Sequence, residues 1–569
     1  MELPCVLSRF TRGVVSPQRA VSPQRTVSPQ RTVSLRRAVS LLLPALLPAS
    51  LFGQSLEPGD VSEPLLTRAE ATGFRETTRY AGVMAFARSV AEADPGIQLT
   101  TYGYTFEGRP LPLLVVGDVD DPSPEGVRRS GKTRVYVQGG IHAGEIAGKE
   151  ALLILLRELS RGEHGHWSDS LVLLVAPLFN ADGNERVNLR NRRRQHGPVG
   201  GMGQRYNALG LDLNRDQMKL DGPESRSLVR LYNQYDPHVS VDLHTTNGTR
   251  HGYHLTYAPP LSPNTPRAMD AFLREEWLPA MTRGVKDETG WDFYYYGGTY
   301  WRRGSGQEQG WYTFDHRPRF VSNYIGIRNR FGVLGEAYAY ATFRDRIDAS
   351  YWLVVELLEF AHTRASEIRS LTREADARSR SLVGDSLALR AVHERSSEPV
   401  TILMGEVEED RNPFTGEIML RRTDVQNPVE MYEYGTFQPT EWARVPSAYY
   451  VSAELAEVRE RLQAHGIRIR ELEEARSAEV EVFTVDSVRT AEREYQGRSP
   501  QEVWGSWQIR EEALEPGTVV VPMDQPLARL AFTLLEPRSD DGFVAWAFLT
   551  DVLEAGHTYP VMKASPEAR

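Results

Sequence analysis

An imidazole and a carboxylate stand three residues apart in the stretch VYVQGGIHAGEIAGKEALLILL, which begins at Val135. His142 and Glu145 follow an apolar run and precede a leucine-rich helical pattern, so they lie where a buried strand should end. A second histidine, His244, ends the run HVSVDLH. Two histidines and one carboxylate form a three-ligand zinc set that leaves a position for water, whose pKa such a site lowers to about 7. These three residues therefore predict a hydrolytic metal centre.

The spacing His-x-x-Glu is weak evidence when it stands alone. The chain has 13 histidines, and about one such match is expected by chance in a sequence of this kind. A turn histidine at His142, or a strand-end His244 hydrogen-bonded to Asp242 or Thr245, explains either residue without a metal. The metal interpretation is favoured because ligands in parallel α/β sheets bind beyond the carboxyl ends of the strands, where all three candidates lie.

The elements that would position these residues alternate between strand and helix. Near-continuous apolar runs, typical of buried parallel strands, occupy 133–139, 170–178 and 238–244. Helical patterns occupy 147–160, 224–235, 265–286 and 347–376. This alternation predicts an α/β fold with a mainly parallel central sheet.

The polar tract ARSRSLVGDS is the predicted boundary between two domains. Residues 60–376 form the predicted catalytic domain. Residues 395–569 contain short β-rich runs and one helical pattern at 453–465, so we expect a smaller C-terminal domain that is β-rich or α+β.

Residues 1–53 predict an export signal. A near-repeat of VSPQRT carries arginine in every copy and leads into an apolar stretch of 16 residues from Ala38 to Gly53. This stretch is short for a membrane span but typical of a secretory signal peptide, so we expect a periplasmic or secreted chain with no stable membrane span after cleavage. A disordered basic tail is the alternative. The single cysteine, Cys5, gives no disulfide framework, and the net charge of -10 argues against nucleic acid as a partner.

Several further motifs follow in an order that resembles the zinc metallocarboxypeptidases related to carboxypeptidase A. They are TYGYTFEGRPLPLLVVG, GGIHAGEIAGKEAL, PLFNADG, GLDLNRD, SVDLHTTNG and FGVLGEAYAY. The resemblance implies a three-layer α/β/α sandwich with a mixed, mainly parallel sheet. It also implies one catalytic zinc ion per chain, bound by His142, Glu145 and His244.

The same resemblance assigns the chemistry. Glu336 would be the general base that takes a proton from a zinc-activated water, although a buried ion pair with Arg328 or Arg330 would also explain a glutamate there. Arg205 would polarise the scissile carbonyl. A basic cluster competes with Arg205 for that role, and it consists of Arg190, Arg192, Arg193 and Arg194.

Substrate recognition is also implied by the resemblance. Asn214 and Arg215 would bind a free carboxylate, because a guanidinium group matches two oxygens in one plane. Tyr324 would be the family's mobile substrate-binding tyrosine, with Tyr312 as the alternative. Residues 304–330 would build the pocket for the substrate side chain.

Three classes of function are compatible with these residues. The first is an exported zinc carboxypeptidase that hydrolyses the C-terminal bond of peptides with a free carboxylate. The second is a zinc deacylase or amidohydrolase that acts on N-acyl amino acids or cell-wall peptides. The third is a metal-free binding module with the same fold. The complete ligand set with Glu336 argues against the third class, and the pair Asn214 and Arg215 favours the first over the second.

Overall fold

The computed structural model describes residues 65–246, 248–299 and 308–565 of the 569-residue chain. The predicted export signal, 1–53, lies outside the described residues. The described part of the chain belongs to one compact unit, Pro64–Arg569. None of its helices combines the length and hydrophobicity that a bilayer span requires.

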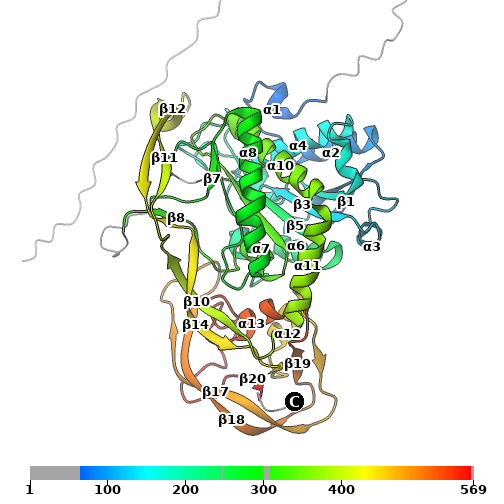
Figure 1. Ribbon diagram of the computed structural model, residues 1–569, viewed down its shortest axis with the longest axis vertical. Helices are drawn as coiled ribbons and strands as arrows, with labels where there is room; N and C mark the ends of the chain where they lie inside the picture. The colour runs from blue at the N-terminus through cyan, green and yellow to red at the C-terminus, as the bar shows by residue number, and fades with distance from the viewer. Residues whose placement is uncertain (1–64, 247, 300–307, 566–569) are drawn as a thin grey trace, which may run out of the picture. The chain divides into compact units, whose positions relative to one another are not determined.

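An eight-stranded mixed sheet occupies the centre of the first part of the chain, in the order β1-β2-β4-β3-β5-β9-β6-β7 (Figure 1). The strands are β1 (Ile97–Tyr104), β2 (Pro110–Val116), β3 (Thr133–Gly139), β4 (Leu171–Ala176), β5 (Val239–Thr245), β6 (Leu255–Ala258), β7 (Phe293–Tyr295) and β9 (Phe331–Ala337). Four of the seven neighbouring pairs are parallel, including all three in the central run β4-β3-β5-β9. The predicted mixed, mainly parallel sheet is therefore confirmed.

Helices cover both faces of this sheet because alternate strand residues point to opposite sides. In β3, Val135 and Val137 join one buried cluster, whereas Tyr136 joins another. Helices α2 (Tyr80–Ala93), α4 (Ala147–Ser160), α8 (Leu278–Thr289), α10 (Phe343–Thr363) and α11 (Ala365–Arg380) pack on the first face. Helices α3 (Pro124–Arg129), α6 (Pro223–Tyr235) and α9 (Val321–Ile327) pack on the second. The three-layer α/β/α arrangement is confirmed.

Two of the predicted helices are interrupted. The pattern at 265–286 divides into α7 (Arg267–Ala271), a π-helical segment Phe272–Trp277 and α8. Pro279 stands in the first turn of α8, where its missing N–H cannot continue the hydrogen-bond pattern of the segment before it. The pattern at 347–376 divides at Arg364 into α10 and α11.

The C-terminal part is β-rich, as predicted. Its elements are β10 (Ser386–Glu394), β11 (Val400–Arg411), β12 (Ile418–Met431), β13 (Glu433–Tyr434), β14 (Thr436–Arg444), β15 (Ala448–Val451), α12 (Ala456–Ala464), β16 (Arg470–Glu471), β17 (Arg476–Thr490), β18 (Gln501–Leu514), β19 (Val519–Pro522), α13 (Ala528–Leu535) and β20 (Val561–Ala564). A six-stranded sheet, β16-β19-β15-β20-β17-β18, forms its centre. Outside it, β10 pairs with β14 and β11 pairs with β12.

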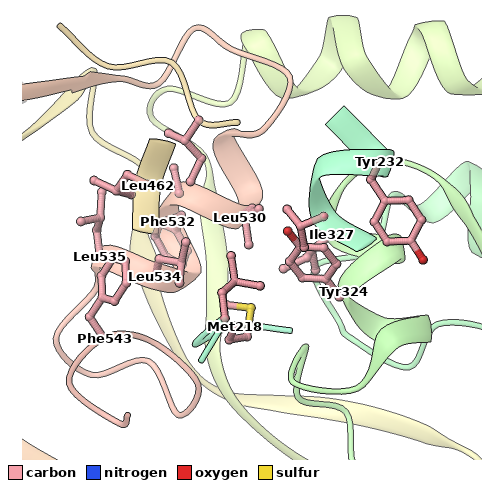
Figure 2. Close-up of a cluster of buried hydrophobic side chains, with 14 of the residues drawn as sticks. Met218, Tyr232, Tyr324, Ile327, Leu462, Leu530, Phe532, Leu534, Leu535 and Phe543 are labelled. Atoms are coloured by element: carbon pink, nitrogen blue, oxygen red, sulfur yellow. The ribbon is translucent and has the colours of Figure 1, made fainter. Parts of the chain in front are cut away.

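The two parts of the chain share one buried core. Figure 2 shows Met218, Tyr324 and Ile327 of the first part packed in the same cluster as Leu530 and Phe532 of α13. The short strand β13 also pairs in parallel with β8 (Trp311–Tyr312). Folding of 395–569 as a separate domain stays a prediction.

Candidate active site

The carboxyl ends of β3, β5 and β9 meet at one edge of the sheet, where the predicted chemistry gathers. In the parallel pair β5 and β9, His244 lies opposite Glu336. The chain leaves β3 through Gly139 and Gly140, and Gly140 has φ +74. A Cβ on Gly139 would lie 2.9 Å from the backbone nitrogen of Lys149, so glycine lets the ligand loop begin directly against α4.

His142, Glu145 and His244 form a compact, buried donor group. One donor atom from each lies within 4.8 Å of the others. His142 Nδ1 is 3.1 Å from Glu145 Oε1, and His244 Nδ1 is 2.8 Å from Glu145 Oε2. Two imidazole nitrogens and a carboxylate are a donor set that zinc prefers, and they leave room for a fourth ligand. The residues present therefore fit a catalytic zinc ion, with both histidines offering Nδ1.

Two aspartates hold the opposite nitrogens of these histidines. Asp212 Oδ1 is 2.9 Å from His142 Nε2, and Asp242 Oδ2 is 2.8 Å from His244 Nε2. Carboxylate partners of this kind fix the tautomer and ring orientation of metal-binding histidines. Burial raises the pKa of Asp212, but His142 and Arg205 outweigh it and hold that pKa well below the usual range.

The sequence interpretation named Asp242 only as a hydrogen-bond partner of His244 in the metal-free alternative, and it gave Asp212 no role. No local spacing predicts the contact of Asp212, because its partner His142 lies 70 residues away in the chain. A signal was available for Asp242, which stands two residues before His244 in DLH. In a strand such a spacing places both side chains on one face, where the carboxylate can meet the imidazole.

The environment of Glu336 is that of a functional carboxylate. Its Oε2 is buried without a hydrogen-bond partner among the described residues. Desolvation raises the pKa of Glu336 to about 8, with His244 opposing the rise and Glu145 adding to it. The alternative ion pairs are not formed, because Arg330 binds Asp236 and Asp376, and Arg328 binds groups around His465. A buried carboxylate left unpaired beside a metal-type donor group is a candidate general base.

Both candidate polarising arginines reach the site. Arg192 donates to Glu145 Oε1 at 2.5 Å. Arg205 donates to Asp212 Oδ2 at 2.9 Å and lies 3.8 Å from Glu145 Oε1. The cavity between them has a volume of about 130 Å³. Its walls include Glu336 from β9 and the aromatic rings of Phe314 and Phe320.

Asn214 and Arg215 line the same cavity. The Asn214 side chain is fixed by the backbone N–H of Val321, which donates to Oδ1 at 2.9 Å. Its amide nitrogen lies 3.4 Å from His244 Nε2. The Arg215 guanidinium stacks over Phe320, with its carbon 3.8 Å from the ring centroid. An amide and a planar cation thus stand beside the donor group, where they can bind an anionic end of a ligand.

Most of these site residues lie in a region whose sequence matches a known family. Residues 83–245 match the family model described as zinc carboxypeptidase. The chain contains a zinc carboxypeptidase domain. The matched region includes His142, Glu145 and His244 together with Asn214 and Arg215, and it ends before Glu336. This match and the carboxypeptidase relatives of the chain support a peptidase hydrolase.

Proteins named as carboxypeptidases are similar to this chain over different shares of its length. Carboxypeptidase 2 of Trichophyton rubrum is 24% identical over 534 residues, which cover 89% of this chain and 90% of that protein. A probable carboxypeptidase 2 of Arthroderma benhamiae is 28% identical over 196 residues, 33% of each protein. Among solved structures, a metallo-carboxypeptidase from Burkholderia cenocepacia is 18% identical with a TM-score of 0.38, covering 51% of this chain and 70% of that chain.

Tyr324 lies outside the cavity of about 130 Å³ that contains the donor group, which we call the carboxypeptidase cavity. Its side chain is buried in the shared core, and its hydroxyl is 2.7 Å from Nδ1 of His465 in the C-terminal part. This placement does not agree with the sequence-based expectation that Tyr324 binds substrate. Tyr312 is also turned away, because its hydroxyl donates to the backbone oxygen of Glu308. Among the described residues, the tyrosine that lines the cavity is Tyr296, which the motifs did not single out.

The predicted side-chain pocket, 304–330, is found only in part. Residues 304–307 lie outside the described residues. Of the remainder, Phe314, Phe320 and Ser322 line the cavity. These three residues of 308–330 line the same cavity as Arg215, so only this part of the predicted side-chain pocket lies at the site.

Proposed function

We propose that the carboxypeptidase domain removes single residues from the C-terminus of peptides, with zinc held by His142, Glu145 and His244. The observation that carries this proposal is that Arg215 and Glu336 share one cavity of about 130 Å³ with the donor group. The guanidinium of Arg215 would pair with the terminal carboxylate and leave the last peptide bond beside the donor group.

Bound zinc supplies a polarised scissile carbonyl and a water of lowered pKa. Glu336 would take the proton of the attacking water and pass it to the leaving amine nitrogen. Burial raises the pKa of Glu336, which favours its holding the proton between the two steps. Asp212 and Asp242 would keep both imidazoles oriented during the reaction.

Arg192 and Arg205 would stabilise the negative charge that develops on the carbonyl oxygen. Both line the cavity, and each is anchored by an acidic residue of the site, Glu145 or Asp212. Pre-oriented cations in a site shielded from water stabilise such charge without reorganisation. Arg192 is as good a candidate for this role as Arg205, because it lies 2.5 Å from Glu145 Oε1 and Arg205 lies 3.8 Å from the same atom.

We also propose that the enzyme is exported. Residues 1–53 support this proposal through their arginine-bearing repeat and the apolar stretch that follows it. The substrate would then be a peptide outside the cytoplasm.

Peptides with free and with amidated C-termini test the reaction directly. We expect stepwise loss of single C-terminal residues from the free peptides only, measured by mass spectrometry. Arg215→Lys should reduce kcat/KM by roughly 30- to 1,000-fold, because a charge-assisted bidentate contact contributes about 2–4 kcal/mol.

Arg161→Lys, an arginine with a half-exposed side chain at the end of α4, is the matched control and should leave kcat/KM unchanged. Equal cleavage of free and amidated peptides would contradict the proposal. Release of an acyl group from the amino end would assign the protein to the deacylase class.

A further inference from the structure

A second cavity lies next to the carboxypeptidase cavity and is larger, with a volume of about 960 Å³. One wall is the segment after β8, and the opposite wall comes from β10 and β14 of the C-terminal part. Phe314 lines both cavities, so only one aromatic side chain is shared between their walls. We call this space the outer cavity. Its volume lies within the roughly 300–1,000 Å³ typical of ligand sites.

The charged groups around the outer cavity are paired with one another. Asp315 binds Arg317 through both carboxylate oxygens. Glu308 accepts from Arg395 at 3.3 Å, and Asp540 lies 3.2 Å from Nε2 of His316. Each of the three acidic groups therefore has a basic partner in the wall. The cavity offers little net charge to a ligand, so it does not select one by ion pairing.

Aromatic and apolar surface remains available between these pairs. The Phe437 ring stands 4.4 Å from His393 and 4.8 Å from His316, measured between ring centroids. Tyr312 and Tyr434, which also line the cavity, stack on each other at 4.0 Å and are almost fully buried, so they support this wall rather than add much free surface. Val392 of β10 lines the cavity with 53% of its surface exposed. Such walls are suited to aromatic and aliphatic side chains, which gain by burial and by edge or stacked ring contacts.

We propose that the outer cavity binds the part of the peptide substrate that precedes the scissile bond, and that it favours aromatic and large apolar residues there. This inference rests on the proposed function. A carboxypeptidase holds only one residue beyond the scissile bond, so the rest of the chain must leave the small cavity through its mouth. An extended peptide advances about 3.3 Å per residue, and the outer cavity adjoins the small one through Phe314. The C-terminal part would thereby contribute to substrate selection.

Two sets of substrates separate the cavities. The first is an N-acetylated dipeptide, which is long enough only for the small cavity. The second is a pair of hexapeptides that end in the same two residues and carry either three phenylalanines or three serines before them. For the unmodified protein we expect kcat/KM to be roughly threefold to thirtyfold higher for the phenylalanine hexapeptide.

Val392→Asp places an unpaired charge in the outer cavity without entering the catalytic machinery. It should remove most of the preference for phenylalanine while leaving cleavage of the acetylated dipeptide unchanged. Phe437→Ala should act in the same direction. Val425→Asp is the matched control, since Val425 of β12 is also an exposed valine, at 41%, and lies outside both cavities.

The outcomes distinguish the two proposals. No cleavage of the dipeptide by the unmodified, zinc-loaded protein would count against the proposed function. Cleavage of the dipeptide with equal rates for both hexapeptides would overturn the outer-cavity proposal alone. The outer-cavity proposal would also be overturned if Val392→Asp and Phe437→Ala kept the full preference for phenylalanine. It would likewise be overturned if these variants lowered kcat/KM for the dipeptide as strongly as for the hexapeptides.

Discussion

Buried polar groups differ in their hydrogen bonding between the sheet edge and the contact with the C-terminal part. At the sheet edge, Glu336 keeps a buried oxygen without a hydrogen-bond partner among the described residues, and its pKa is raised to about 8. At the contact, the Tyr324 hydroxyl and His465 Nδ1 are 2.7 Å apart, and Arg319 donates to Asp541 at 2.8 Å. The first arrangement lowers stability and the second supports it.

This difference teaches where substitutions should change chemistry and where they should change folding. An unpaired buried acid is tolerated where its reactivity is used, so replacing it should reduce turnover and relieve an unfavourable burial. A satisfied buried pair has no spare bonding capacity, so breaking it leaves a partner unpaired. Substitutions in the two regions should therefore separate cleanly into two kinds of effect.

The largest expected effect is that of Glu336→Gln. The amide keeps the size of the side chain but cannot accept the proton, so kcat should fall by about 10²- to 10⁴-fold. Zinc content should remain the same, since Glu336 is not among the three donors. The melting temperature should stay equal or rise, because a buried carboxylate is replaced by a neutral group. Turnover, metal analysis and thermal melting measure the three outcomes.

Glu150→Gln is the matched control in the same layer of the fold. Glu150 of α4 is fully buried, and its two oxygens accept from both hydroxyls and one backbone N–H of Thr77 and Thr78. The same substitution should therefore lower stability by about 1–3 kcal/mol and leave kcat nearly unchanged. Loss of zinc from Glu336→Gln would show that Glu336 is a ligand, and the comparison would fail.

The metal site could be predicted because its signals are local. Strand ends place side chains at a known edge of a parallel sheet, so the positions of His142 and His244 follow from the apolar runs that precede them. Glu336 was assigned from the family resemblance. The donor group has the expected members. Asp242 was within reach of the same reasoning, since it stands two residues before His244 in β5. Asp212 was not, because it meets His142 from 70 residues away in the chain.

Other features depended on contacts between distant segments, which no local pattern contains. The long connection between α5 (Ala181–Glu185) and Asn214 decides whether Arg192 or Arg205 reaches the site, and both do. Tyr324 fitted its motif, but its hydroxyl meets His465, which lies 141 residues further along the chain. The shared core was likewise hidden, because it joins residues such as Met218 and Phe532 that lie hundreds of residues apart in the sequence.

Tyr324→Phe should give an intermediate effect and decides the role of that residue. His465 Nε2 must donate to the backbone oxygen of Met218, so Nδ1 accepts from the Tyr324 hydroxyl. Removing the hydroxyl leaves a buried acceptor unpaired, which should lower the free energy of unfolding by about 1–3 kcal/mol. Denaturant titration measures this loss. The kcat should change by less than about threefold, and a large fall in kcat at unchanged stability would instead place Tyr324 in the chemistry.

The smallest expected effect is that of breaking a hydrogen bond between the C-terminal part and Asp212, the residue that contacts the metal ligand His142. Gln496 stands at the tip of the β17–β18 hairpin with φ +54, and its Oε1 accepts from the backbone N–H of Asp212 at 2.8 Å. Gln496→Ala should lower kcat/KM and zinc affinity by roughly twofold to tenfold, as expected for one neutral hydrogen bond. Gln496→Glu keeps an acceptor and should recover part of the loss.

Gln508→Ala, an exposed glutamine on β18, is the control for Gln496→Ala and should change neither quantity. Competition with a chelator measures zinc affinity, and the unfolding free energy should stay within about 1 kcal/mol of the unmodified protein. A loss of zinc as severe as that expected on removing one of the three metal ligands would make the hairpin tip part of the metal site. The division between a reactive sheet edge and a supporting C-terminal part would then no longer hold, because the hairpin would control the orientation of His142 through Asp212.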